Sequence, residues 1–156
     1  MNELDPISRT LLAVLDNQVA RTDRALEGLR NDVFDASPGG DCNSIRSIGE
    51  HLLQLRKFQL KLLESPLADE VAEPGCVQSP DTLAAKLAEA VDLVRQAIAA
   101  HDTDDWFRKP DSPRKGPWGD EPTIQRFAKP LNDFTSHLGG IRTIRRILGD
   151  PAEGTQ

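Results

Sequence analysis

Hydrophobic residues recur at the spacing of an α-helix in four segments of the chain, separated by stretches rich in proline, glycine and polar residues. In each segment the apolar positions follow at intervals of three and four residues, with charged residues on the opposite side. The pattern predicts four amphipathic helices, at about residues 5–30, 43–65, 79–101 and 123–148. The second of them is expected to open at Asn43 or Ser44, either of which is a good N-cap.

Local signals mark where two of these helices begin and end. Ser79 is a good N-cap and Pro80 a good first helical residue, which predicts the start of the third helix. Gly149 predicts the end of the fourth helix. Pro130 lies inside the fourth segment, where we expect it to kink the helix or to delay its regular part to the following turn.

The connections before the second and fourth helices differ in length. Residues 35–43, DASPGGDCN, predict a turn. Residues 102–122 contain four prolines, two glycines and both tryptophans, and predict a long loop or a short hairpin before the last helix. Together these elements predict an all-α fold, a four-helix bundle that forms a single domain over residues 1–156.

Length and charge narrow the class of protein. A chain of 156 residues is long enough to bury a core. A net charge of -6 argues against a nucleic-acid-binding protein, which needs a clustered basic surface. No stretch resembles a membrane span or a signal peptide, so we expect no membrane partner and a cytoplasmic location. The two cysteines, Cys42 and Cys76, are predicted to be free thiols.

Two of the three histidines fall on the apolar stripes of different helices. His51 follows the stripe of the second helix and His137 that of the fourth, while Asp133 lies one turn before His137. Two imidazoles and one carboxylate leave a position open for water, a ligand set that suits catalytic zinc and also iron or nickel. A second interpretation is that the histidines are hydrogen-bonded core residues and that Asp133 is a helix-stabilising partner of His137.

The third histidine and the long loop also allow two interpretations each. His101 closes the third helix, where it either favours the helix C-terminus or acts as a substitute ligand or an acid-base group. Three aromatic residues of the loop either pin it to the bundle or line the mouth of a pocket: Trp106, Phe107 and Trp118. Four basic residues of the loop face either solvent or a small anionic ligand: Arg108, Lys109, Arg114 and Lys115.

Two stretches resemble the DinB/YfiT-like superfamily. In SIRSIGEHLLQL (residues 44–55) a Ser-Ile pair leads through another Ile to His-Leu, and HLGGIRTIRRILGDP (residues 137–151) begins with a His and ends in Leu-Gly-x-Pro. The resemblance covers nearly the whole chain. It implies an up-down-down-up four-helix bundle, often a homodimer. It also implies a divalent metal, typically nickel or zinc, held by a His of the second helix and a His-x-x-x-His pair of the last.

Carried over residue by residue, the resemblance places His51 as the first metal ligand, Asp133 as the middle one and His137 as the last. Asp133 departs from the usual His, although a carboxylate is still a competent ligand. Gly139 matches the family glycine, and Gly140 stands where a glutamine is usual. We expect this glycine pair either to let the helix approach a neighbour closely or to leave room for a ligand.

The resemblance implies a bacterial enzyme, either a metal-dependent hydrolase or a transferase that uses a low-molecular-weight thiol such as bacillithiol or mycothiol, acting on a small-molecule substrate. The alternative is a non-catalytic DinB-like bundle, serving as a dimeric scaffold or a stress-related binding protein. Asp133 and the missing glutamine favour that alternative. A third class is a regulatory module that binds a small anionic ligand through residues 102–122.

Overall fold

The computed structural model describes residues 4–110 and 119–150, and every regular element in that part of the chain is helical. The prediction of an all-α fold is confirmed. Three short elements lie in the connections: the α-helix α2 (Asn31–Asp35) and the 3-10 helices η1 (Pro66–Glu70) and η2 (Thr103–Phe107). Four helices are long: α1 (Pro6–Leu26), α3 (Ile45–Leu62), α4 (Pro80–Ala100) and α5 (Thr123–Ile147).

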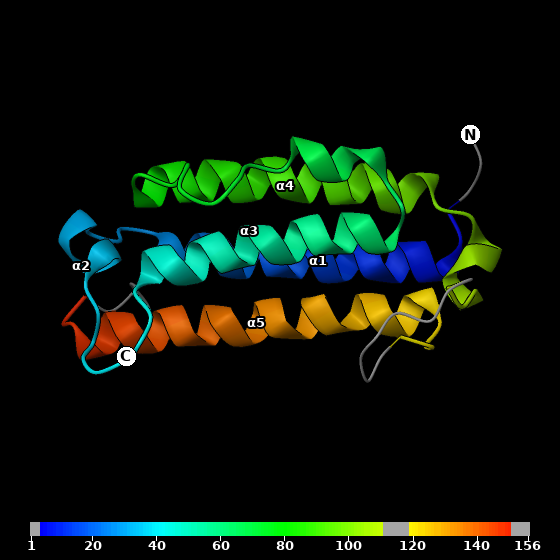
Figure 1. Cartoon of the computed structure of the whole chain (residues 1–156). Coiled ribbons are helices and arrows are strands. Elements are labelled where there is room, and N and C mark those ends of the chain that lie inside the picture. The colour runs from blue at the N-terminus through cyan, green and yellow to red at the C-terminus, as the bar shows by residue number, and fades with distance from the viewer. Residues whose placement is uncertain (1–3, 111–118, 151–156) are drawn as a thin grey trace.

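The four long helices lie side by side (Figure 1). α1 and α3 each pack against both α4 and α5, so every long helix has two long neighbours. α3 and α4 begin at the end of the molecule that holds α2, whereas α1 and α5 end there (Figure 1). The connection between α3 and α4 therefore returns along the length of the bundle. None of the helices described is long and apolar enough to cross a membrane.

The predicted helix boundaries agree with the structure at most ends. Ser44 and Ser79 cap α3 and α4, each accepting a hydrogen bond from the backbone N–H three residues further on. Gly149, with φ +71°, follows the end of α5 in the left-handed conformation that glycine favours. α5 runs without interruption from Thr123 through Pro130, so the prediction that proline delays its regular part was wrong.

The first helix is shorter than predicted, because α1 ends at Leu26 rather than at Arg30. Gly28 has φ +61°, which turns the chain out of the helix. The chain then forms α2, a short helix that the sequence pattern did not indicate, and buries Val33 and Phe34 against the bundle. The turn-rich residues that follow concealed this element.

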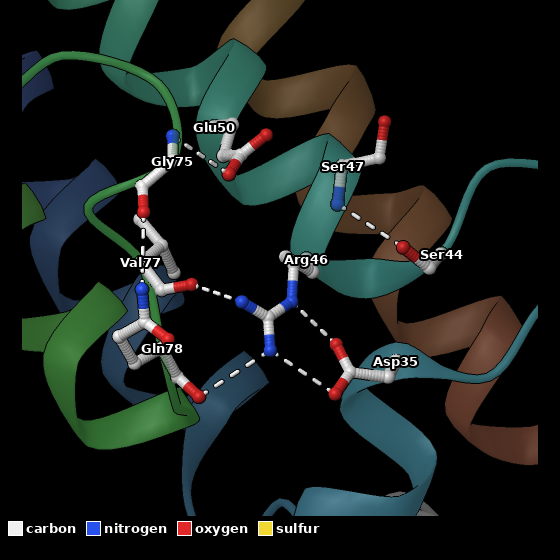
Figure 2. A network of polar contacts seen from close by, with 8 residues as sticks. All are labelled: Asp35, Ser44, Arg46, Ser47, Glu50, Gly75, Val77 and Gln78. Carbon is white, nitrogen blue, oxygen red and sulfur yellow. Dashed lines mark hydrogen bonds and ion pairs between the residues drawn. The ribbon is translucent and has the colours of Figure 1, made fainter.

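Arg46, in the first turn of α3, joins three segments of the chain (Figure 2). Its guanidinium group forms two hydrogen bonds with the carboxylate of Asp35, at the end of α2. It also donates to the carbonyl oxygens of Val77 and Gln78, just before α4. Glu50, one turn further along α3, accepts a hydrogen bond of 3.0 Å from a backbone N–H of the same connection. The network holds α2 and the start of α4 against the start of α3.

The bundle core contains a buried polar cluster beside its apolar residues. Arg56 of α3 is fully buried and donates hydrogen bonds of 2.9 Å to the side-chain oxygens of Gln18 and Gln59. Gln18 donates in turn to the carbonyl oxygen of Leu131, at 2.7 Å. These bonds link α1, α3 and α5 through their side chains and satisfy most of the buried polar atoms involved.

Candidate metal centre

The imidazole rings of His51 and His137 meet where α3 and α5 pack against each other. Their centroids are 4.6 Å apart, and the ring planes are inclined by 76°, an edge-to-face arrangement. The two residues lie on different helices and are far apart in sequence, so the fold alone brings them together. This pair is the centre of the candidate site.

The pair lies at the border of the core rather than within it. His137 is half-buried and His51 is exposed, so the prediction that both histidines face the core was wrong for His51. At 100° per residue, the buried face of α3 spans roughly 180° and is centred near Leu52 and Arg56. His51 falls just outside that face, together with Phe58, whose side chain is 43% exposed. The site is consequently open to molecules from solution.

Burial is the main cause of a lowered pKa at His137. The neighbouring imidazole of His51 lowers this pKa further, and the carboxylate of Asp133 raises it by a smaller amount. His137 is therefore neutral near pH 7, and the neutral imidazole is the form that binds a metal.

Asp133 lies one turn before His137 and is exposed. It is near enough to act on the pKa of His137. Even so, no three His, Cys, Asp or Glu side chains within residues 4–110 and 119–150 are grouped as metal ligands. The structure thus brings together two of the three predicted site residues, and the carboxylate of Asp133 faces solvent beside them.

The glycines after His137 do not serve a close helix contact. A Cβ atom added at Gly139 would meet nothing within 4 Å, and one at Gly140 would lie an ordinary 3.9 Å from the side chain of Ile48. The expectation that this pair permits a close helix contact was wrong, and the other expectation, that it leaves room for a ligand, stays a prediction. The close approach occurs instead at Gly49 of α3.

The other residues singled out from the sequence lie elsewhere. His101 is the C-cap residue of α4, in line with its predicted position at the helix end. Phe107 is 63% exposed and does not pin the loop, whereas Trp106 is fully buried and does. Both cysteines, Cys42 and Cys76, are free and exposed, as predicted. Three loop residues and the expected hairpin fall outside the described part of the chain: Arg114, Lys115 and Trp118.

Comparison with known protein families gives a match. The sequence model of a protein family, the DinB superfamily, matches residues 15–137 of this chain, which is most of its length. The matched range includes both histidines of the pair and Asp133. No curated protein matches the chain.

Proposed function

The chain belongs to the DinB superfamily, and we propose from this membership and from the site that it is a metal-dependent enzyme. In this proposal His51, His137 and Asp133 hold a divalent metal between α3 and α5, with nickel or zinc as the first candidates and iron as the third. The reaction is a hydrolysis or the transfer of a low-molecular-weight thiol to a small-molecule substrate. The observation that carries the proposal is the meeting of the two imidazoles.

The separation of the two rings supports a shared metal. Two imidazole nitrogens at about 2.1 Å from one tetrahedral zinc ion place their ring centroids roughly 5 Å apart. The centroids of His51 and His137 are 4.6 Å apart, and their planes are inclined rather than stacked. A small rotation of either side chain is enough to direct one nitrogen of each ring at a common point. The donor set therefore fits a borderline cation such as zinc or nickel.

The remaining site residues have separate tasks in this proposal. Asp133 is on the helix turn next to His137, so a change of its side-chain rotamer completes the ligand set with a carboxylate. Gly140 follows His137 by three residues and so lies on roughly the same side of α5, where it presents no side chain to an approaching substrate or thiol. A divalent metal held there supplies Lewis-acid chemistry, which lowers the pKa of water or of a thiol and makes it a nucleophile near neutral pH.

The helix order of the family is part of the same proposal. The directions of the four long helices in Figure 1 support an up-down-down-up bundle, with α1 and α5 running one way and α3 and α4 the other. In that order α3 and α5 are antiparallel neighbours, which places the middle of α5 beside the first half of α3. That register is the reason His137 reaches His51.

A second function has its own supporting observation. Asp133 is exposed and not grouped with the two histidines as a ligand. This favours a non-catalytic DinB-like bundle that keeps the fold as a dimeric scaffold or a stress-related binding protein. The two functions differ in one measurable property, which is stoichiometric binding of a metal.

The test is metal analysis of protein purified without a histidine tag, followed by titration of the metal-free protein with zinc and nickel. We expect about one metal ion per chain and loss of most of the affinity in the variants His51→Ala and His137→Ala. His101→Ala serves as the matched control, because it removes a histidine that lies outside the pair. If the protein contains no stoichiometric metal and binds neither ion, the enzyme proposal is contradicted and the non-catalytic scaffold is favoured.

A further inference from the structure

A second polar site lies at the other end of the bundle, where the end of α4, η2 and the first turn of α5 meet. It is a pocket of about 100 Å³. A volume of this size holds several water molecules, or a ligand of a few non-hydrogen atoms. Arg126 in this site precedes His137 by roughly 16 Å along α5, so the pocket is separate from the histidine pair. Its ionisable lining residues are Glu64, His101, Asp105, Arg108, Lys109 and Arg126.

The walls of the pocket are firmly placed. The carbonyl oxygen of Arg108 accepts hydrogen bonds from both the backbone N–H and the hydroxyl of Thr123, at 3.0 and 3.2 Å. Trp106 of η2 is fully buried and packs edge to face against Phe127, with ring centroids 5.6 Å apart. The exit of η2 is thereby tied to the start of α5, and the charged groups are held in a fixed arrangement.

His101 contributes a polar atom without a partner. Its ring packs edge to face against Trp106 at a centroid distance of 4.4 Å. Its Nε2 atom is buried and has no hydrogen-bond partner in the part of the chain that the structure describes. Burial, as the largest effect, lowers the pKa of His101, so its ring is neutral at pH 7. The neutral ring of His101 thus forms part of the pocket wall, held in place against Trp106.

The charges around the pocket favour an anion. Three cationic side chains line it against two carboxylates, which leaves a positive balance in a chain whose net charge is -6. Arg108 lies within 3.8 Å of Glu64 and 3.5 Å of Asp105, so it pairs with both carboxylates, and the three cations together outnumber the two carboxylates by one charge. Arg126 is buried in the pocket wall, where a guanidinium group binds a planar or tetrahedral oxyanion strongly.

We propose that this pocket binds a small oxyanion, a carboxylate or a phosphate, between Arg126 and Lys109 with His101 beside it. The sequence indicated the basic residues of the loop but not Arg126. That residue lies on the apolar face of α5, one turn before Pro130, and an arginine in such a position is the signal that identifies it. The proposal is independent of the metal centre, since it shares no residue with it.

Trp106 provides the readout for a test. The chain has two tryptophans, so the variant Trp118→Phe leaves Trp106 as the only one, in contact with His101. Its fluorescence is followed while sodium acetate or sodium phosphate is added, with sodium chloride at equal ionic strength as the reference. We expect a saturable change with acetate, phosphate or both. The more effective anion identifies the ligand class.

Variants of exposed residues keep the test independent of folding. In the Trp118→Phe background, Lys109→Gln is expected to weaken the binding by about tenfold, the loss of one charge-assisted interaction. Lys86→Gln, which removes a partly exposed lysine near the start of α4, far from the pocket, is expected to leave the binding unchanged. The proposal is overturned if neither oxyanion gives a saturable change, if chloride gives the same change, or if Lys109→Gln and Lys86→Gln bind equally well.

Discussion

The guanidinium group of Arg56 lies over the ring of Phe134 in the middle of the bundle, with its Cζ atom 3.8 Å from the ring centroid. Two glutamine side chains complete its contacts, and no ion pair to it occurs among the residues described. Burial lowers the pKa of Arg56 to about 9, and the positive charge of Arg95 adds to this effect. The core therefore keeps a cation at a cost in desolvation free energy.

Replacing Arg56 by a side chain of similar length separates its packing from its charge. We expect Arg56→Met to unfold at the same denaturant concentration as the wild type or to be more stable by up to ~2 kcal/mol, because the desolvation cost disappears. Arg56→Ala is expected to be less stable by about 2–4 kcal/mol, because it leaves a cavity. Equal destabilisation in the two variants would show instead that the hydrogen bonds outweigh the desolvation cost.

The same residue predicts a pH dependence. The pKa of Arg56 is about 9 in the folded chain and higher in the unfolded chain, so above pH 9 the unfolded chain holds the proton of Arg56 more tightly. The free energy of unfolding therefore gains a contribution that rises with pH above about pH 9. Below that pH Arg56 is protonated in both the folded and the unfolded chain, and the full desolvation cost of the buried charge lowers the free energy of unfolding. We expect any stability advantage of Arg56→Met to shrink as the pH is raised above 9, measured by urea unfolding.

Gly49 marks the closest approach of α3 and α4. A Cβ atom at this position would press into the Leu83 side chain, with Cδ1 at 2.8 Å, and Leu83 is fully buried, so its side chain or the helices must shift. We expect Gly49→Ala to lower the free energy of unfolding by about 1–3 kcal/mol. The loss is expected although alanine favours a helix over glycine by about 1 kcal/mol.

Gly139→Ala is the matched control for that substitution. It makes the same chemical change inside a helix, but its Cβ would meet nothing within 4 Å. Only the helix propensity then acts, and we expect a gain of about 0.5–1 kcal/mol. Thermal unfolding followed by circular dichroism measures both variants. A loss of stability in Gly139→Ala would contradict the open space beside this residue.

The buried face of α3 was only partly predictable from the sequence pattern. The pattern located the helix and its cap correctly, but it placed the apolar stripe along His51. The true centre of the buried face includes Arg56 and Gln59, which are polar and therefore look like solvent-facing positions. Their burial depends on Gln18, a residue of another helix, so the pattern of α3 alone could not reveal it. The predicted stripe was displaced to one side for this reason.

The glycines show the same limit. The sequence drew attention to Gly139 and Gly140, because two adjacent glycines inside a helix are unusual. Which glycine permits a close helix contact depends on the neighbour it faces, and only the fold places Leu83 opposite Gly49. The histidine pair was predictable from spacing and resemblance, because both residues lie beside apolar stripes. The orientation of Asp133 was not, because a position at the border of a stripe fits either environment.

The Arg46 network predicts a local effect on α2. Arg46→Lys keeps the charge but loses the paired hydrogen bonds with Asp35 and the contacts to the backbone before α4 (Figure 2). We expect amide hydrogen exchange in residues 31–35 to become at least about tenfold faster, because the paired hydrogen bonds tie the end of this short helix to α3. Exchange in the middle of α5 should not change. Equal acceleration in both regions would show global destabilisation and contradict a local clamp.

Lys57→Gln is a suitable control for Arg46, because Lys57 also pairs with a carboxylate of the same connection, Glu73. That pair lies further along α3 and does not involve α2. We expect the exchange rates of residues 31–35 to stay at their wild-type values in this variant, because a single exposed ion pair contributes only about 0–1 kcal/mol. This result would assign the slow hydrogen exchange of α2 to the paired hydrogen bonds of Arg46 rather than to positive charge on α3 in general.

Whether Asp133 binds the metal distinguishes the two proposed functions. A substitution that adds a stronger ligand at this position is a sharper test than one that removes the carboxylate. Asp133→His supplies the residue that the family resemblance implies at this position, one turn from His137. We expect the affinity for zinc and nickel to rise by about tenfold or more, since imidazole suits both ions better than a carboxylate does. Titration calorimetry on metal-free protein gives the affinity, and Asp23→His, on the exposed face of α1, is the control.

The comparison of Asp133→His with Asp133→Ala shows whether the carboxylate of Asp133 binds the metal or faces solvent. If Asp133 already completes a metal site, Asp133→Ala lowers the affinity below the wild type and Asp133→His raises it above. If Asp133 is only a surface residue, Asp133→Ala binds as the wild type does, while Asp133→His still gains a third ligand beside the two imidazoles. Addition of His51→Ala to Asp133→His should abolish the gain, because a metal at this place needs both helices. A gain that survives the loss of His51 would place the metal elsewhere and contradict a site between α3 and α5.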